Sequence, residues 1–234
     1  MALQKKVALV TGGRGALGSV LARRLVEEGA HVVVSFQENK EKRGGKKAME
    51  SGIVPVRADL TKQADVVALY DAIVKKFSRV DIVLNTVGGF LPAKPLVDVT
   101  LTEWNRMLDI NLKSTFLSTR EALRRMKGQP YGRIINISAM VGLNPTPGKA
   151  PYGVAKAGVS LLTEIVAQEQ KGTGITINAI APSTILTPAN LAWATGGEEH
   201  KWVKPEEIAD LIVYLCSVSA SAITGTTIKA YGGV

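Results

Sequence analysis

The chain has 234 residues, 46% of them hydrophobic, which is enough for one sizeable core in a single α/β domain spanning residues 1–234. No apolar run approaches the ~20 residues of a membrane-spanning helix, and the chain enters an apolar strand without a signal-peptide pattern. We therefore expect a cytoplasmic protein with no membrane segment. The single cysteine, Cys216, excludes an internal disulfide and a cysteine-rich metal site. It lies in an apolar helical stretch and is expected to be a buried structural thiol.

The formal net charge of +9 raises the hypothesis of nucleic-acid binding. The densest basic stretch, residues 39–50, mixes Glu41 and Glu50 with its lysines and contains no aromatic residue for base stacking. This pattern is more typical of a solvated surface, and an anionic cofactor or substrate accounts for part of the charge equally well. We therefore expect a small-molecule ligand and no nucleic-acid partner. No Asp/His cluster has metal-ligand spacing, so no metal is expected.

Apolar, β-rich runs alternate along the chain with segments of helical periodicity such as 16–29 and 101–126. The runs are residues 6–11, 31–36, 53–58, 80–86, 132–138, 174–181 and 225–231. Near-continuous Val/Ile runs indicate strands buried on both faces, hence a parallel sheet. Alternation with helices then predicts a Rossmann-type, doubly wound sheet of about seven strands with helices on both faces. Ligands bind such sheets at the carboxyl ends of the strands.

The first strand runs into the glycine-rich stretch TGGRGALG, residues 11–18, which opens a helix near Ala16. The stretch fits two spacings, G-x-G-x-x-G from Gly13 and T-G-x-x-x-[AG]-x-G from Thr11. In either frame, glycines allow a tight turn and a close backbone approach to a pyrophosphate at the helix N-terminus. We expect dinucleotide contacts from Gly12, Arg14, Gly15, Ala16, Leu17 and Gly18.

The second strand ends at Ser35-Phe36-Gln37 and has no carboxylate to accept hydrogen bonds from a ribose 2′-hydroxyl, Glu38 being the nearest. Ser35, Gln37 and Arg14, with Lys40 or Lys42 nearby, would instead accommodate a 2′-phosphate. The sequence therefore favours NADP(H), with NAD(H) as the alternative. The alternative interpretation, that the Arg14 side chain simply faces solvent and contacts no cofactor, also stays open.

Tyr152 and Lys156 lie four residues apart at the start of a predicted helix, 152–169, and so share one face. A nearby cation favours the phenolate and would make the tyrosine a more useful general acid/base. Ser138 ends its predicted strand and could point its hydroxyl into the same cleft.

With these residues in place, the chain resembles the short-chain dehydrogenase/reductase family over nearly its whole length. Further matching positions are the helix asparagine Asn111, the strand-end pair Asp59-Leu60, Asn85 and Gly88 after the fourth strand, and Pro182, Ile185 and Thr187 after the sixth. The frame from Thr11 is the one that the family uses.

The resemblance implies hydride transfer between a nicotinamide and a carbonyl or alcohol substrate. By that resemblance Tyr152 protonates the alkoxide and Ser138 hydrogen-bonds the carbonyl. Lys156 holds the nicotinamide ribose and lowers the tyrosine pKa, and Asn111 anchors a proton-relaying water. Asp59 and Leu60 would contact the adenine, and residues 182–187 the carboxamide. A homodimer or homotetramer is implied in the same way.

Several segments depart from this pattern. Residues 85–88 read Asn-Thr-Val-Gly where the family has NNAG, and Ser183 follows Pro182 where glycine is usual. The stretches GGRGALG, VGGF (87–90) and TILTPANLA (184–192) resemble the dihydropteridine reductase branch, which generally lacks the serine and the asparagine. A pteridine-type reductase acting on a C=N bond is therefore the alternative to a reductase of small ketones or 3-oxoacyl thioesters. A cofactor-sensing protein without turnover is a third hypothesis, against which the catalytic set argues.

Residues 187–204 are short for the family's substrate lid. Gly196 and Gly197 could form its hinge, and Trp193 and Trp202 could cover a flat or apolar substrate or else anchor the loop to the core. His200 is expected at the surface.

Overall fold

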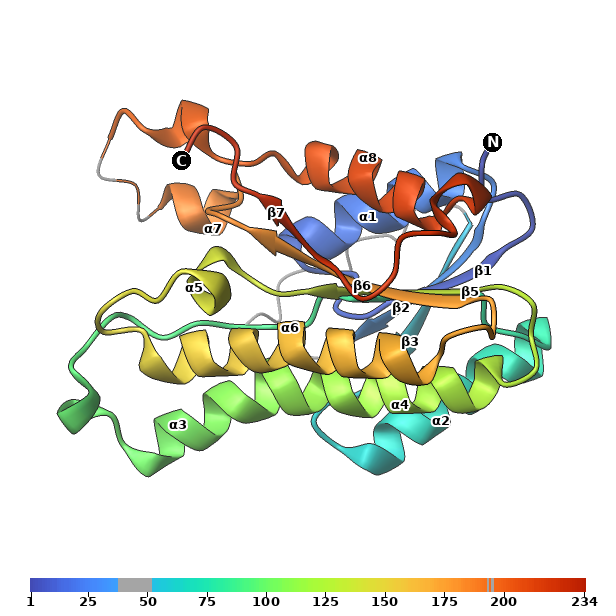
Figure 1. The fold of residues 1–234 in the computed structure, drawn as a ribbon, viewed down its shortest axis with the longest axis horizontal. Coiled ribbons are helices and arrows are strands. Elements are labelled where there is room, and N and C mark those ends of the chain that lie inside the picture. The colour runs from blue at the N-terminus through green and yellow to red at the C-terminus, as the bar shows by residue number, and fades with distance from the viewer. Residues whose placement is uncertain (38–51, 193, 195) are drawn as a thin grey trace.

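The computed structural model describes residues 1–37, 52–192, 194 and 196–234, and its central feature is one sheet of seven parallel strands (Figure 1). The order across the sheet is β3-β2-β1-β4-β5-β6-β7. The strands are β1 (Val7–Val10), β2 (His31–Phe36), β3 (Ile53–Arg57), β4 (Ile82–Asn85), β5 (Gly132–Ile137), β6 (Ile175–Pro182) and β7 (Thr227–Ala230). The doubly wound sheet is confirmed, and each strand ends within two residues of its predicted bounds.

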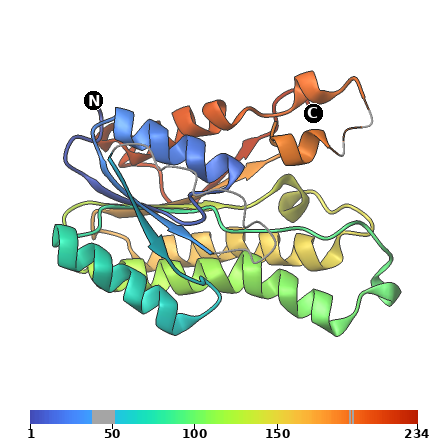
Figure 2. The same cartoon turned by 180° about the vertical axis from the view of Figure 1, so that it is seen from behind.

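Helices cover both faces of the sheet in two layers, as the front and back views show (Figures 1 and 2). One layer holds α1 (Ala16–Glu27) and α8 (Pro205–Cys216), and the other holds α2 (Gln63–Phe77), α4 (Ser114–Met126) and α6 (Ala150–Glu169). Shorter elements are η1 (Leu96–Asp98), α3 (Leu101–Leu108), η2 (Asp109–Lys113), α5 (Met140–Leu143), α7 (Pro188–Leu191), η3 (Glu199–Lys201) and η4 (Val218–Ala220). Among the described residues, no helix combines the length and hydropathy needed to cross a membrane.

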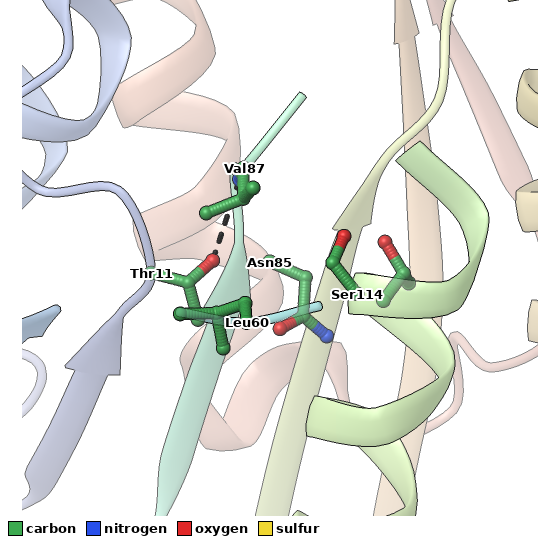
Figure 3. Close-up of a pocket in the computed structure, with 6 residues that line it drawn as sticks. Thr11, Leu60, Asn85, Val87 and Ser114 are labelled. Carbon is green, nitrogen blue, oxygen red and sulfur yellow. Dashed lines mark hydrogen bonds between the residues drawn. The ribbon is translucent and has the colours of Figure 1, made fainter. Parts of the chain in front are cut away.

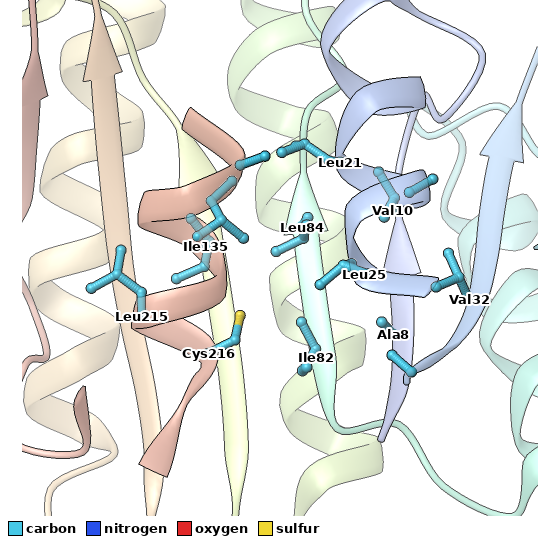
Figure 4. Packing of buried hydrophobic residues seen from close by; sticks show 14 of the residues in the cluster. Ala8, Val10, Leu21, Leu25, Val32, Ile82, Leu84, Ile135, Leu215 and Cys216 are labelled. Carbon is cyan, nitrogen blue, oxygen red and sulfur yellow. The ribbon is translucent and has the colours of Figure 1, made fainter. Parts of the chain in front are cut away.

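Alternate residues of the strands pack into two hydrophobic cores, one on each face of the sheet. Val10 and Leu84 pack with Leu21, Leu25 and Cys216 beneath α1 and α8 (Figure 4). Leu9, Val83 and Ile134 belong to the opposite core, under α2, α4 and α6. Burial on both faces explains why the strands read as continuous Val/Ile runs. Cys216 is fully buried, as expected, and burial raises its pKa to about 12.

The predicted helix 101–126 is not continuous, which corrects the sequence interpretation. A π-helical turn, η2, separates α3 from α4 and carries Asn111. Such a turn inserts a residue into the helical ladder and is found frequently at functional sites. Helix α6 begins at Ala150, two residues before the predicted start, with Pro151 in its first turn. The basic segment 39–50 lies outside the described residues, as do Glu38 and Trp193.

Candidate active site

The glycine-rich turn joins β1 to α1 at the carboxyl edge of the sheet. Gly12 has a φ of +67°, a left-handed conformation that favours glycine. A Cβ on Gly18 would lie 2.5 Å from the Gly12 carbonyl oxygen, so glycine at both positions lets α1 pack directly against the turn. Thr11 accepts a hydrogen bond from the amide of Thr86, 3.0 Å away, which ties the turn to the end of β4. The close contact of Gly12 with Gly18 supports the frame that begins at Thr11.

The N-terminus of α1 is suited to an anion. Gly15 is the N-cap residue, no described side chain caps the helix, and its first turn, which contains Ala16 and Leu17, holds no acidic residue. A Cβ on Gly15 would meet only the Gly12 carbonyl oxygen, at 3.2 Å, so the turn presents bare backbone. Free amides at the positive end of a helix dipole fit a pyrophosphate. The residues present therefore fit a dinucleotide.

Arg14 stacks on Phe36, which ends β2, with the guanidinium carbon 3.4 Å from the ring centroid. Gln37 follows and is exposed. Ser35, by contrast, is fully buried, and its hydroxyl accepts a hydrogen bond from the Gly12 amide at 3.2 Å. The predicted contact of Ser35 with a 2′-phosphate is therefore wrong. Because residues alternate along a strand, this side chain points inward and fixes the glycine turn.

The carboxyl ends of β3 and β4 form the next part of the sheet edge at which the glycine-rich turn lies. Leu60 and Asn85, together with Thr11, Val87 and Ser114, line a small cavity that is open to solvent and encloses about 130 Å³ of empty space between their atoms (Figure 3). Asn85 donates hydrogen bonds to Thr119 and Asn136, while its side-chain oxygen has no partner among the described residues.

Asp59 lies beside this cavity, in the loop that follows β3. Partial burial opposes its ionisation, but hydrogen bonds from the Thr61 hydroxyl and amide, and the nearby Lys62, lower its pKa below the usual range. Asp59 is therefore an ionised hydrogen-bond acceptor at the position predicted to contact the adenine.

Gly88, Asn111 and Lys156 come together from three separate elements. A Cβ on Gly88 would lie 2.8 Å from Asn111 Oδ1 and 3.4 Å from Lys156 Nζ. Asn111 Oδ1 accepts from the Gly89 amide at 3.1 Å, and its Nδ2 donates to the Gly89 carbonyl at 2.9 Å. The fully buried asparagine thus fixes the π-helical turn to the loop after β4. Glycine at position 88 leaves room for the lysine beside it.

Tyr152 and Lys156 share one face of α6, as predicted, with the ammonium 5.8 Å from the phenol ring centroid. Burial raises the pKa of Tyr152 to about 12 and lowers that of Lys156 to about 8. The expected lowering of the tyrosine pKa by the lysine is therefore not found in this arrangement. Lys156 Nζ instead donates to the Ile137 carbonyl at 2.7 Å. At neutral pH the phenol is protonated and is suited to donate a proton.

Ser138 does not have the surroundings that its predicted role requires. Only 1% of it is exposed, and its hydroxyl lies 2.9 Å from both the Lys156 carbonyl oxygen and the Ser160 hydroxyl. It fastens the end of β5 to the turn of α6 that carries Lys156. The prediction that it faces a substrate is wrong, because this strand-end side chain points under the helix. The next residue along the chain is Ala139, whose side chain has no polar atom and so offers no hydroxyl in place of that of Ser138.

Residues after β6 form the base of the predicted lid. Ile185 pairs with Val203, and the Leu186 amide donates to the Val203 carbonyl at 2.8 Å. Thr187 is the N-cap of α7 and accepts from the Asn190 amide at 3.3 Å. Gly196 and Gly197 have φ values of +99° and +91°. Pro182, at the end of β6, and the nearby Ile185 and Thr187 thus lie beside this parallel bridge, and His200 is exposed as expected.

Two residues that matter for the site have no obvious sequence signal. A Cβ on Gly142 would lie 2.7 Å from the Lys156 carbonyl carbon, so α5 can approach α6 only because this residue is glycine. Ser160 completes the hydrogen bonding of Ser138. Gly142 and Ser160 both influence the position of Lys156, and their roles become visible only in the packing of the folded structure.

This geometry agrees with comparisons to known proteins. A family model described as short chain dehydrogenase matches residues 6–196. The chain belongs to the short-chain dehydrogenase/reductase family. It is 34% identical to 3beta-hydroxysteroid dehydrogenase 1 of Eggerthella lenta, with 99% of this chain and 94% of that protein covered. It is 31% identical to D-beta-hydroxybutyrate dehydrogenase of Rhizobium meliloti, with 97% and 98% covered.

A solved structure extends the likeness to three dimensions. The crystal structure of 3-ketoacyl-(acyl-carrier-protein) reductase from Brucella melitensis, complexed with NADH, matches with a TM-score of 0.88 and 29% identity, over 99% of this chain and 98% of that one. As a member of the family, the chain is an oxidoreductase that transfers hydride with a nicotinamide cofactor.

Proposed function

We propose that this short-chain dehydrogenase/reductase is an NADP(H)-dependent reductase of carbonyl compounds, and a dehydrogenase of the corresponding alcohols. The observation that carries the proposal is the meeting of Tyr152 and Lys156 with Gly88 and Asn111 at the carboxyl edge of the sheet. Parallel α/β sheets bind their ligands at this edge. A glycine turn suited to a pyrophosphate lies at the same edge.

The chain's own residues would position the substrate and move one proton. A nicotinamide held at this edge would supply the hydride for the carbonyl carbon, which leaves the π electron pair on the carbonyl oxygen. The Tyr152 phenol gives its proton to that oxygen and regains one from solvent. Lys156 presents an ammonium beside the phenol and stabilises the phenolate as it forms. The Ile137 carbonyl holds the lysine in place and Gly88 leaves room for it, while a role for Asn111 in proton relay stays a prediction.

The preference for NADP(H) is supported by the Arg14–Phe36 stack. The phenyl ring fixes a guanidinium at the end of β2, where the ribose of the adenine half is expected. A fixed planar cation suits a phosphate group, which it can bind through two parallel hydrogen bonds.

The surroundings of Ser138 favour a second candidate, a reductase of a C=N bond in a flat heterocycle. With that hydroxyl used internally, Tyr152 is the proton donor and no strand-end serine polarises an acceptor oxygen. A conjugated C=N system needs less help from a second donor because its own ring delocalises the charge. Flat aromatic substrates that compete with ketones under NADPH would support this candidate.

A homo-oligomer is supported by an apolar surface on α4 and α6. Phe116, Val154, Leu161 and Ile165 are each between 41% and 58% exposed on these two helices. Residues 154, 161 and 165 follow a helical repeat and so form one stripe on α6. A contiguous apolar stripe of this kind is typical of an interface, and a two-fold axis would pair it with itself.

The proposed function is tested by titrating the protein with NADPH and then adding a panel of ketones and 3-oxoacyl thioesters. We expect saturable binding followed by substrate-dependent oxidation of NADPH. Tyr152→Phe should reduce turnover about a thousandfold while leaving the NADPH dissociation constant nearly unchanged. Loss of cofactor binding in this variant would show that the role of Tyr152 is misassigned. Binding without oxidation by any carbonyl or C=N substrate would contradict an enzymatic function.

A further inference from the structure

Tyr231 directly follows β7 and is attached to the start of the segment predicted to contact the nicotinamide carboxamide. Its carbonyl oxygen accepts a hydrogen bond from the Ser183 hydroxyl at 2.8 Å, and the Ser183 amide donates to the Ala230 carbonyl at 3.0 Å. Serine stands at position 183 where glycine is usual in the family, so it supplies a hydroxyl that glycine lacks. The residue after β7 is thus fixed to the residue after β6.

Two glycines further along the chain contact the other half of the lid base, which consists of residues 183–186 and 201–203. The Gly233 amide donates a hydrogen bond to the Lys201 carbonyl at 2.9 Å. Gly232 has a φ of +64°, and a Cβ on it would collide with the same carbonyl oxygen. In both ribbon views the chain lies between α7 and η3 here (Figures 1 and 2). Both halves of the lid base are therefore attached to the segment that follows β7.

The side chain of Tyr231 contacts a second wall, which is formed by α5. Its hydroxyl lies 3.2 Å from Asn144 Nδ2, which donates the hydrogen bond. Asn144 is the C-cap residue of α5, and its amide donates to the Met140 carbonyl at 2.8 Å. Helix α5 in turn packs through Gly142 against the turn of α6 that carries Lys156. One side-chain hydrogen bond therefore connects the lid base to the wall that packs on α6.

This connection lies along the sheet edge at a distance from the glycine turn. The turn follows β1, the third strand in the order across the sheet. Helix α5 follows β5, and the lid base and Tyr231 follow β6 and β7, the last two strands of that order. A dinucleotide extends along this edge from the turn that holds its pyrophosphate. The nicotinamide end and the substrate are therefore expected on the side of α5 and the lid base.

We propose that Tyr231 is a positioning residue for the carbonyl substrate, because its hydrogen bond with Asn144 holds the lid base and α5 at a fixed separation. The inference rests on the proposed function, since it places the substrate between these two parts. Binding between walls that are already fixed costs less ordering than binding between walls that move independently. The hydrogen bond therefore lowers KM and leaves the chemical step, in which Tyr152 gives the proton, unchanged.

The kinetic test uses Tyr231→Phe, which keeps the ring and removes the hydroxyl. With ethyl acetoacetate as the ketone and saturating NADPH, we expect KM to rise about three- to tenfold and kcat to stay within about twofold. Asn144→Leu should have the same effect, and the double variant should be no worse than either single one. Asn144→Asp should keep the low KM, because a carboxylate can accept a hydrogen bond from the tyrosine hydroxyl. The matched control is Tyr214→Phe, in the last turn of α8, which should leave KM and kcat unchanged.

Hydrogen exchange separates this inference from the proposed function, because it needs no turnover. Measured by mass spectrometry on the protein alone, peptides covering 139–149 and 198–204 should exchange several-fold faster in Tyr231→Phe and Asn144→Leu than in wild type or Asn144→Asp. Faster exchange confined to these peptides would support the connection, even in a protein that reduced no ketone. Unchanged exchange in both peptides would overturn it, and so would faster exchange along the whole chain, which indicates a general loss of stability. A Tyr231→Phe variant with an unchanged KM for ethyl acetoacetate would overturn it as well.

Discussion

Lys156 Nζ donates a hydrogen bond to the backbone carbonyl of Ile137, 2.7 Å away, across the gap between α6 and the end of β5. The side chain is almost fully buried, and this bond is its direct contact with the strand that precedes Ser138. The lysine is therefore held in place by the protein before any cofactor binds. Burial disfavours the charged ammonium relative to the neutral amine, and this lowers the pKa of Lys156 to about 8.

The first prediction concerns the pH dependence of reduction. The ammonium of Lys156 is present below its pKa of about 8 and is lost as the pH rises through that value. We expect kcat/KM for NADPH, which reports the free enzyme, to be level below pH 8 and to fall about tenfold per pH unit above it. Tyr152, with its pKa raised to about 12, stays protonated throughout this range. Lys156→Arg should move the decline above pH 10, and a level wild-type profile up to that pH would contradict the assignment.

The second prediction separates positioning by Ser138 from catalysis. Ser138→Ala leaves the Ser160 hydroxyl and the Lys156 carbonyl each without one partner. We expect a loss of about 1–2 kcal/mol in the free energy of unfolding and less than about a tenfold loss in kcat, far below the loss in Tyr152→Phe. The measurements are denaturant unfolding and steady-state kinetics, with Ser160→Ala as the control for the shared hydrogen bond.

A loss of kcat as large as that of Tyr152→Phe, with unchanged stability, would restore the substrate-contacting role for Ser138. The pH profile gives an independent check. A positioning role predicts that the alkaline limb assigned to Lys156 moves in Ser138→Ala, because the turn that carries the lysine is no longer fastened to β5.

The third prediction concerns the Arg14–Phe36 stack. Arg14→Ala should weaken NADPH binding by about tenfold or more and leave NADH binding nearly unchanged, since only NADPH carries the 2′-phosphate. Phe36→Leu should act in the same direction but less strongly, because it removes the ring that holds the guanidinium. Fluorescence titration with both cofactors measures this directly. Equal weakening of NADPH and NADH would show that Arg14 does not recognise the phosphate.

The fourth prediction tests the apolar stripe on α6. The double variant Leu161→Glu, Ile165→Glu should convert a dimer or tetramer into smaller species, because burying two carboxylates in an apolar interface is unfavourable. Val218→Glu is the control, since Val218 is 72% exposed on η4, away from α4 and α6. Light scattering coupled to size-exclusion chromatography gives the masses. A monomeric wild type at micromolar concentration would contradict the interface.

The sequence by itself determined the sheet and the helix that carries the tyrosine and lysine. Continuous Val/Ile runs such as 31–36 are a local signal, because a strand buried on both faces must be apolar at every position. The spacing of Tyr152 and Lys156 is equally local, since a helix brings residues four apart to one face. The place of the glycine turn, directly after the first strand, follows from the same regular alternation, whereas the strand order comes from the structure.

Only the tertiary structure decided which side chains face the site. Ser35 and Ser138 both lie at strand ends, where ligands bind, yet both are buried. The Ser35 hydroxyl accepts a hydrogen bond from the Gly12 amide, and the Ser138 hydroxyl bonds to the Lys156 carbonyl and the Ser160 hydroxyl. The direction of a side chain at a strand end depends on where the next element packs, which the order of residues does not state. The same holds for the π-helical turn at Asn111 and for Gly142 against α6, since each is fixed by contacts with segments distant in the chain.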